Sequence, residues 1–530
     1  MALEDIAPGD FKARTMARGD RFKHGLHYDE TAAPVVHTPA LKCEVAWAVY
    51  KGLSLYQWDV GAAFYGNQMD RKGVIVQCPP GYDPHSTDLR PLHLPPLYSE
   101  LAGALPGIPP GSLLHYQAIK PELEALNFKS LAADNCVFLH STIDMATTLH
   151  VDDGVLACPS LKHAEQVLGA MGLGAKRKIT WGPLKCTLGV DFNVSYSAER
   201  RVVFMSQRAL AVTILERANM ISCNPARLPA TAGRVYTKKD CPSTEEAKSD
   251  LAARGMTKDN YHSIQASINF YRAITRDDLA FINGKLAKFV ANPGEEHHKA
   301  QKQELRFIKG TLDYGVEFVW NSSDAPNTDG PLRVEAWSDS SYADDRDTGR
   351  TTLGFVIKAN NATITSASKL KLSARVDSCV NHSELNAFTA TTGPSASDSV
   401  TDGANTTLVR TMRTIAWLRG VKAGLEHRDE ASMPRTPVYV DNAGVLSMLK
   451  DTTLKSANKH IYRTLQEARE RVSLDKAVVA VKVHTRDNIA NAMTKQEPGI
   501  DASAAQLRLI TGPCSINSTS SQSGGRVGQY

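Results

Sequence analysis

Acidic residues stand at predicted turns in the first part of the chain, where their oxygens could hold a metal ion. Asp59 ends an apolar segment and is followed by small residues. Asp152 and Asp153 lie at the tip of a predicted hairpin with apolar residues on both sides. Adjacent carboxylates at a tight turn offer several oxygens in a small volume, which suits hard cations such as magnesium. The alternatives are structural, since Asp59 could cap a helix and Asp-Asp-Gly is itself a favourable turn.

A second set of acids lies in the last 200 residues. Asp339 ends one predicted strand, Asp441 ends another, and Glu384 lies in the first turn of a helix that could cross them. Three converging carboxylates would repel one another unless cations neutralised them. Two divalent ions about 3.5–4 Å apart would activate a water molecule and stabilise the leaving oxygen of a phosphodiester. Each acid could equally be a surface residue or a helix cap, and spacing alone leaves both interpretations open.

The elements that must position these acids follow from the hydrophobic pattern. We expect a strand at 53–60, a hairpin at 145–158, and helices at 263–275 and 298–310. Beyond a linker-like stretch at 320–331 the expected order is strand (332–338), hairpin turning at Asn360-Asn361 (352–367), helices (383–392 and 408–422), strand (437–441), helix (443–450) and strand (477–484). This order predicts an α+β part followed by an α/β part.

Composition narrows the class of protein. The chain has 530 residues, a net charge of +5 and 42% hydrophobic residues, which argues against general disorder and permits a nucleic-acid partner without requiring one. No apolar run approaches the roughly 20 residues of a membrane-spanning helix, and no secretory signal is present, so we expect a cytoplasmic or nuclear protein without a membrane partner. Nine scattered cysteines favour a reducing compartment over a disulfide framework or zinc site. Phosphate-loop, zinc-protease and nucleophile-elbow motifs are absent.

An ordered series of segments resembles one known family. It includes QWDVGAAF (57–64), LHVDDGVLAC (149–158), SDSSYADDRDTGRTTLGF (338–355), VYVDNAGVL (438–446) and NIANAMTK (488–495). Together the collinear segments resemble the C-terminal part of a copia-type retrotransposon polyprotein, reverse transcriptase followed by ribonuclease H. The resemblance implies a polymerase palm with partial fingers and thumb/connection, followed by an α/β ribonuclease H-like domain. The implied divisions are fingers and palm (1–225), thumb/connection (226–320), ribonuclease H-like domain (332–497) and a disordered tail (498–530).

The resemblance also implies roles for single residues. The palm acids would bind two Mg²⁺ ions, and the later acids would bind two more to cleave the RNA strand of a hybrid. Phe64 would exclude a ribose 2′-hydroxyl, although it could be a core aromatic. Lys12 and Arg14 would contact a triphosphate, although they could be a solvated basic pair. The implied partners are an RNA template, a DNA primer, an RNA–DNA hybrid and deoxynucleoside triphosphates; the oligomeric state is not implied.

Several positions depart from the family pattern. His150 and Pro106 stand where the family has tyrosine, and Asn491 stands at the fourth nuclease acid. About 20 residues are inserted near 393–407, and the resemblance begins inside the fingers. Two further hypotheses therefore stand beside the active polymerase and nuclease: a degraded remnant that only binds nucleic acid, and a chain that keeps only nuclease activity.

Overall fold

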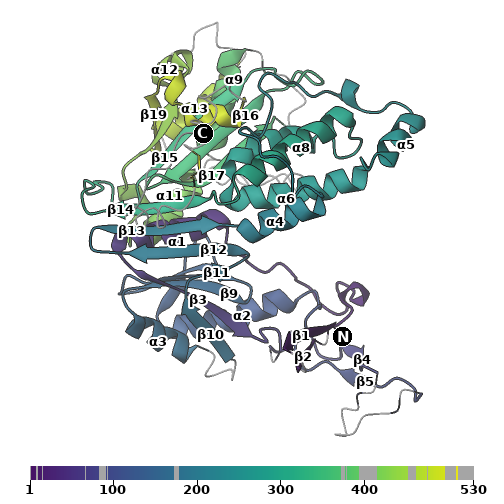
Figure 1. Ribbon diagram of the computed structural model, residues 1–530. Helices are drawn as coiled ribbons and strands as arrows, with labels where there is room; N and C mark the ends of the chain where they lie inside the picture. Colours follow the sequence, from purple (N-terminus) through teal and green to yellow (C-terminus); the bar gives the residue numbers. More distant parts are fainter. Residues whose placement is uncertain are drawn as a thin grey trace, which may run out of the picture. The chain divides into compact units, whose positions relative to one another are not determined.

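Helices and sheets are mixed along the whole chain in the computed structural model (Figure 1). This confirms the mixed α/β class predicted from the sequence. The structure describes residues 2–512 except 8–9, 15, 66, 81, 83–90, 92, 172–177, 372–376, 378, 393–414, 452–460, 474–475, 496–508 and 511. The insertion expected at 393–407 lies outside the described residues, as does most of the expected tail.

The chain divides into two compact units. The first comprises Met1–His37 and Leu53–Leu184, and the second comprises Thr38–Gly52 and Lys185–Tyr530. The chain therefore enters the second unit for a single helix, returns to the first, and then leaves it again. The finer division into fingers, palm, thumb and ribonuclease H-like regions stays a prediction.

The first unit is built around a six-stranded antiparallel sheet in the order β10-β3-β9-β8-β7-β6. Helix α3 packs on β3, β9 and β10, and two separate hairpins, β1–β2 and β4–β5, complete the unit. The elements are β1 (Ala2–Ala7), β2 (Asp10–Arg14), β3 (Ser54–Gly61), β4 (Ile75–Gln77), β5 (Tyr98–Glu100), α2 (Gly111–Ala125), β6 (Phe128–Ser130), β7 (Val137–His140), β8 (Ala146–His150), β9 (Asp153–Cys158), α3 (Leu161–Ala170) and β10 (Lys178–Pro183).

The hairpin predicted at 145–158 forms, but it does not turn where the Asp-Gly pair indicated. His150 pairs with Asp153, so the two-residue turn is Val151 and Asp152, with Val151 at φ +60°. Gly154 lies inside β9, opposite Trp58. A Cβ atom on Gly154 would lie 2.2 Å from the Trp58 ring. The glycine is therefore needed for the close approach of a buried indole, not for the turn.

The second unit begins with α1 (Thr38–Lys51), whose residues Ala40–Val49 are all buried. It also contains a four-stranded antiparallel sheet in the order β11-β12-β13-β14, and a helical group lies between β13 and β14 along the chain. These elements are β11 (Cys186–Thr187), β12 (Val190–Tyr196), β13 (Arg200–Ser206), α4 (Arg208–Arg217), α5 (Glu245–Ala253), α6 (Lys258–Thr275), η3 (Asp277–Leu279), α7 (Ala280–Ala287), α8 (Glu295–Gly310) and β14 (Val316–Asn321). The helices predicted at 263–275 and 298–310 are confirmed as parts of α6 and α8.

The same unit contains a five-stranded mixed sheet in the order β17-β16-β15-β18-β19, where β15, β18 and β19 run parallel. The predicted hairpin turning at Asn360-Asn361 is confirmed, because both residues have positive φ between β16 and β17. The elements are β15 (Val334–Ser341), β16 (Thr352–Ala359), β17 (Ala362–Leu370), α9 (Val380–Thr392), α11 (Ile415–Leu425), β18 (Thr436–Val440), α12 (Ala443–Lys450), α13 (Tyr462–Ser473), β19 (Val478–Lys482) and η8 (Ile489–Met493).

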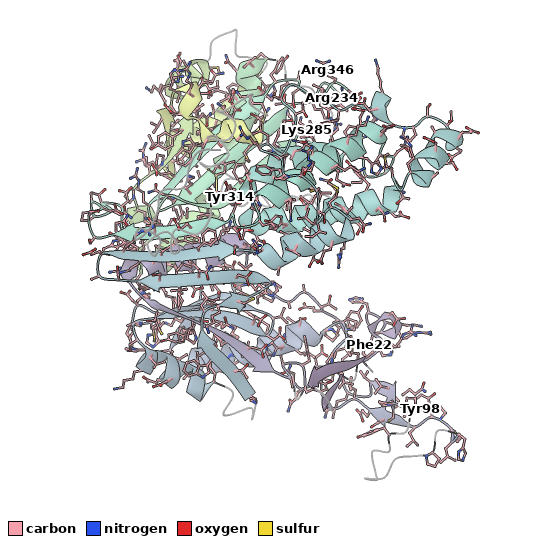
Figure 2. All side chains as sticks on the ribbon, viewed as in Figure 1. Phe22, Tyr98, Arg234, Lys285, Tyr314 and Arg346 are labelled. Atoms are coloured by element: carbon pink, nitrogen blue, oxygen red, sulfur yellow. The ribbon has the colours of Figure 1, made fainter. Side chains whose placement is uncertain are left out.

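The expected tail is not wholly separate from the core. Leu509 and Ile510 are buried in a cluster with Val356 and Met493. The hydroxyl of Thr363 donates a hydrogen bond to the main-chain carbonyl of Leu509 at 2.6 Å. Tyr314, labelled in Figure 2, packs against the same cluster. These two tail residues are therefore part of the fold, contrary to their assignment to a disordered segment.

Candidate functional site

The three acids of the first unit lie together at one end of the β3–β9 strand pair. Asp59 on β3 is directly opposite Asp153, the first residue of β9. Asp152 occupies the adjoining turn, where its main-chain carbonyl accepts a hydrogen bond from the Val60 amide at 2.9 Å. Directly opposite residues in an antiparallel pair have Cβ atoms about 4.5–5.5 Å apart, so register alone brings two of the carboxylates side by side.

The surroundings of Asp153 in this first acid group disfavour the negative charge of its carboxylate. Burial raises the pKa of the half-buried Asp153 carboxyl, and the Asp152 and Asp59 carboxylates raise it further. The hydroxyl of Thr180, opposite Asp59 on β10, donates to the Asp59 carboxylate at 3.4 Å. A bound cation would relieve the repulsion, and the available ligand atoms are carboxylate oxygens of the kind that Mg²⁺ prefers.

The residues predicted to bind a nucleotide are only partly described. Phe64 is half-buried, with its ring centroid 6.3 Å from that of the buried His115. A Cβ on Gly111 would lie 3.2 Å from the Phe64 ring, so this glycine leaves room for the aromatic side chain. Lys12 and Arg14 lie on β2, but their side chains are outside the described part of the structure.

The second set of acids forms a compact cluster in the second unit. Ligand atoms of Asp339, Glu384 and Asp441 all lie within 4.8 Å of one another, the one such cluster among the residues that the structure describes. Strands β15 and β18 are parallel neighbours with Trp337 opposite Tyr439. Asp339 and Asp441 each stand two residues farther along, so they meet at the same end of the sheet. Helix α9 supplies Glu384 from near its start.

Burial and mutual repulsion raise the pKa values of two acids in this three-acid cluster. Burial raises the pKa of Glu384 to about 8, with further contributions from the carboxylates of Asp339 and Asp441. Burial likewise raises the pKa of Asp339 to about 6, although a hydrogen bond from the Thr494 hydroxyl and the charge of Lys495 act in the opposite direction. The Thr494 hydroxyl donates to Oδ2 of Asp339.

One oxygen of the cluster has no hydrogen-bond partner among the described residues. Oε2 of Glu384 is buried and accepts no hydrogen bond from any residue that the structure describes. A buried carboxylate oxygen without a partner is costly, and it fits a position where a cation belongs. The set of three carboxylates also matches the oxygen ligands of Mg²⁺. The residues present therefore fit a divalent metal site, and Asp339, Glu384 and Asp441 would hold it.

Asn491 does not act as a charged fourth ligand. It is buried within η8, and its Nδ2 atom donates to the main-chain carbonyl of Thr485 at 2.7 Å. Its Oδ1 atom is buried and accepts no hydrogen bond within the described part of the chain. An amide oxygen can ligate a metal ion but brings no charge, so any cation here would be balanced by three carboxylates.

The sequence of this chain is similar to those of known proteins. Residues 2–232 match the family model described as reverse transcriptase (RNA-dependent DNA polymerase). The Pol polyprotein of transposon TNT 1-94 from Nicotiana tabacum is 24% identical over 493 residues, which is 92% of this chain. The Pol polyprotein of transposon RE1 from Arabidopsis thaliana is 24% identical over 496 residues, again 92% of this chain. These matches support a copia-type retrotransposon polyprotein.

The chain corresponds to a part of the length of these relatives. It spans 33% of the TNT 1-94 polyprotein and 29% of the RE1 polyprotein. Among solved structures, the foamy viral protease-reverse transcriptase in complex with RNA/DNA hybrid aligns with a TM-score of 0.37 and 10% identity, covering 84% of this chain and 45% of that chain. A likeness of this degree supports no conclusion.

No described helix has the length and apolarity to cross a bilayer.

Two contributors to the acid sites could not be identified from the sequence. Thr494 donates to Asp339 across 155 residues of chain, and no local pattern marks such a partner. Gly154 permits Trp58 to lie across the strand pair that carries Asp59 and Asp153. A glycine inside a strand often marks a place where another group approaches the backbone closely. The Asp-Gly pair favours a turn instead, so the sequence alone does not distinguish the two roles.

Proposed function

We propose that this chain is an RNA-directed DNA polymerase joined to a ribonuclease H, acting on a primer–template hybrid with two Mg²⁺ ions per active site. Its polymerase site would consist of Asp59, Asp152 and Asp153, and its nuclease site of Asp339, Glu384 and Asp441. The single observation that carries the proposal is the convergence of the three later acids, from strand β15, the residue after β18 and helix α9, with ligand atoms within 4.8 Å of one another. Divalent cations, when bound, would supply neutralising charge and activate the attacking oxygen.

The polymerase half rests on the register of β3 and β9. Asp59 and Asp153 face each other on the same side of the sheet, beside the turn that carries Asp152. Phe64 follows Asp59 by five residues, and its ring would exclude a ribose 2′-hydroxyl from the nucleotide position. Lys12 and Arg14 would hold the triphosphate, because charge-assisted hydrogen bonds to phosphate are strong. The partners would be RNA template, DNA primer and deoxynucleoside triphosphates.

The nuclease half rests on the buried cluster. The pKa values of Asp339 and Glu384 are raised in the absence of a cation, so cation binding and proton release would be coupled. Thr494 holds the Asp339 carboxylate in a fixed position by its hydrogen bond. The RNA strand of a hybrid would present its phosphodiester to these oxygens.

Primer extension on an RNA template with magnesium tests the polymerase half. Extension that Asp152→Asn or Asp153→Asn abolishes would support it. Cleavage of the RNA strand of a hybrid, lost in Asp339→Asn or Glu384→Gln, tests the nuclease half separately. Extension or cleavage that persists unchanged in these variants would refute the assignment of the acids.

The second candidate function is binding of nucleic acid without polymerisation. Asn491 favours it, because its amide is committed to the Thr485 carbonyl and the nuclease cluster lacks a fourth charge. A chain that retains hybrid binding, weakened by salt, while failing to extend a primer would support this candidate. Cleavage without extension would support nuclease activity alone.

A further inference from the structure

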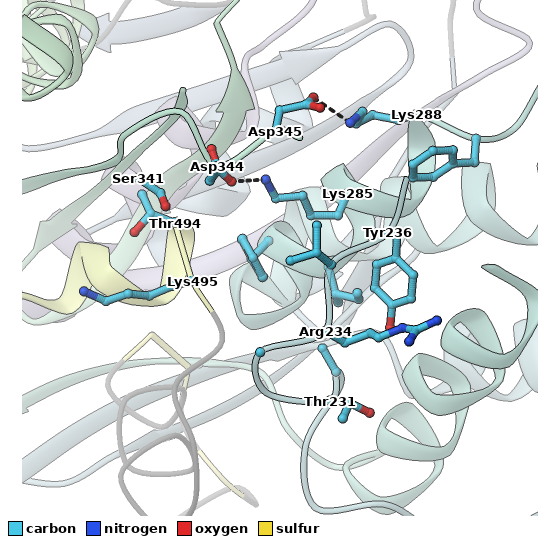
Figure 3. Close-up of a pocket in the computed structure, with 16 residues that line it drawn as sticks. Thr231, Arg234, Tyr236, Lys285, Lys288, Ser341, Asp344, Asp345, Thr494 and Lys495 are labelled. Atoms are coloured by element: carbon cyan, nitrogen blue, oxygen red, sulfur yellow. Dashed lines mark hydrogen bonds and ion pairs between the residues drawn. The ribbon is translucent and has the colours of Figure 1, made fainter. Parts of the chain in front are cut away.

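Thr494, whose hydroxyl donates to Oδ2 of Asp339, follows the short helix η8 directly. This 3₁₀ helix spans five residues (Ile489–Met493), and Thr494 and Lys495 come immediately after it (Figure 3). A 3₁₀ helix has poorer hydrogen-bond geometry than an α-helix and is used in short pieces, so it adds little stability of its own. The position of the Thr494 hydroxyl therefore depends on what holds η8 in place.

Two contacts with neighbouring strands anchor η8. Asn488, which precedes it, donates from Nδ2 to the main-chain carbonyl of Ser338 on β15 at 3.0 Å. On β16, a Cβ at Gly354 would lie 2.6 Å from Cγ2 of Thr494 and 2.7 Å from Cβ of Met493. So close an approach leaves η8 and the residue after it no room to move nearer to β16.

The apolar side chains of η8 pack with the two tail residues, Leu509 and Ile510. Both tail residues are buried in one cluster with Ile489 and Met493. The Thr363 hydroxyl on β17 donates to the main-chain carbonyl of Leu509 at 2.6 Å, which ties the tail to the sheet. The two tail residues therefore cover apolar surface of η8, and this burial stabilises the helix against displacement.

A cavity beside the tail residues leaves their packing incomplete. Its volume is about 280 Å³, and its walls include Leu509, Ile510 and Ile489. Atoms that face a void lack van der Waals partners on that side. The position of the tail therefore depends on its packing in the cluster and on the Thr363 hydroxyl, so the loss of either contact should loosen it.

We propose that Leu509 and Ile510 are positioning residues of the three-acid cluster: by packing with η8, they hold the Thr494 hydroxyl where it donates to Asp339. A hydrogen-bond partner that orients a ligating group is typically worth about 10–100-fold in metal affinity. The tail acts through η8 and Thr494 rather than as a metal ligand. This inference rests on the proposed nuclease function, and it adds to that site a segment beyond the expected ribonuclease H-like domain (332–497).

The test measures Mn²⁺ affinity of the full chain by calorimetry, and the signal of the cluster is the part that Glu384→Gln removes. Leu509→Ala should weaken this binding about tenfold, the lower end of the effect of losing such a partner. Leu509→Met conserves the volume of the side chain and should keep the wild-type affinity. Thr363→Val removes the hydrogen bond to the tail and should weaken binding at least about twofold, which tests the tail even if Leu509→Ala fails to fold.

Leu305→Ala provides the matched control. Leu305 is, like Leu509, a leucine of the second unit that is 2% exposed. It belongs to a separate cluster, built mainly from α4, α6 and α8, whose described members include none from η8. Leu305→Ala should lower the free energy of unfolding without changing Mn²⁺ affinity.

A double-mutant cycle separates positioning from a general loss of structure. If the tail acts through the Thr494 hydroxyl, Leu509→Ala should cause no further loss of Mn²⁺ affinity in a Thr494→Val background. Additive losses in the cycle, an equal loss in Leu305→Ala, or wild-type affinity in Leu509→Ala or Thr363→Val would overturn the inference while leaving the proposed function intact. Absence of any Mn²⁺ binding that Glu384→Gln removes would overturn both.

Discussion

Replacing Gly154 by alanine should disrupt the strand pair that carries the acids of the first unit. The new Cβ would lie 2.2 Å from the ring of Trp58, which is only 2% exposed and cannot swing into solvent. The indole N–H also donates to the Thr147 hydroxyl at 3.0 Å, deep in the sheet. Both the ring and this hydrogen bond would have to shift.

The cost follows from two contributions. Overpacking a core typically costs about 1–3 kcal/mol, and displacing the buried indole N–H from its partner adds about 1–3 kcal/mol. We expect a loss of about 3–4 kcal/mol in the local stability of β3, β8 and β9. That corresponds to amide hydrogen exchange roughly two to three orders of magnitude faster in these strands.

Hydrogen exchange read by mass spectrometry measures this effect strand by strand. Gly182→Ala is the matched control, because a Cβ at Gly182 on β10 of the same sheet meets no atom within 4 Å. In a Trp58→Leu background the Gly154→Ala change should cost little, giving a coupling of about 2–3 kcal/mol. Exchange at the wild-type rate in Gly154→Ala, or additive effects in the double variant, would refute the reasoning.

Four other outcomes are expected. Carboxyls must lose their protons to bind a cation, and the pKa of Glu384 is raised to about 8. The affinity for Mn²⁺, measured by calorimetry, should therefore fall at least about tenfold from pH 8.5 to pH 6. An affinity that does not change with pH would contradict this. Burial raises the pKa of Glu304 on α8 from 4.5 to about 8, so its contribution to stability is present below pH 4.5 and lost as pH rises through 8, by at most about 5 kcal/mol. Glu304→Gln should flatten the dependence of Tm on pH, and an unchanged slope would argue against it. Thr494→Val should weaken Mn²⁺ binding and lower the free energy of unfolding by about 1–3 kcal/mol. Thr494→Ser keeps the hydroxyl and should retain both the affinity and the stability. Equal losses in the two variants would exclude the hydrogen bond as the cause. Leu509→Ala should lower the free energy of unfolding by about 2–3 kcal/mol if this residue belongs to the core, and thermal unfolding with no change would place it outside.

The sequence predicted most of the elements near the acids because apolar residues recur in those segments at a spacing typical of strands. Burial alternates in β3 from Tyr56 onward and throughout β18, and Asp339 lies in β15 after its mostly buried first half. Since parallel strands end at the same edge of a sheet, their final acids could be expected to meet. The roles of these acids in catalysis stay predictions, as do those of Lys12 and Arg14.

What the sequence could not supply are contacts between distant segments. The burial of Leu509 depends in part on Ala280 and Val356, which lie more than 100 positions earlier in the chain, so no local pattern signals it. The turn of the hairpin was misplaced because Asp-Gly is a good turn former, and the steric demand of Trp58 on Gly154 outweighed that local preference. Local rules were overruled wherever a large buried side chain needed the space.

Helix α1 imposes a condition on anyone who wishes to separate the two units. Its residues Ala40–Val49 are buried within the second unit, against β13, β14 and β17, while the segments before and after it belong to the first. A fragment ending at Leu184 would carry an apolar helix stripped of its neighbours, and a fragment starting at Lys185 would have an empty groove. Neither half can be excised by one cut, so swapping either between polyproteins requires splicing at three junctions.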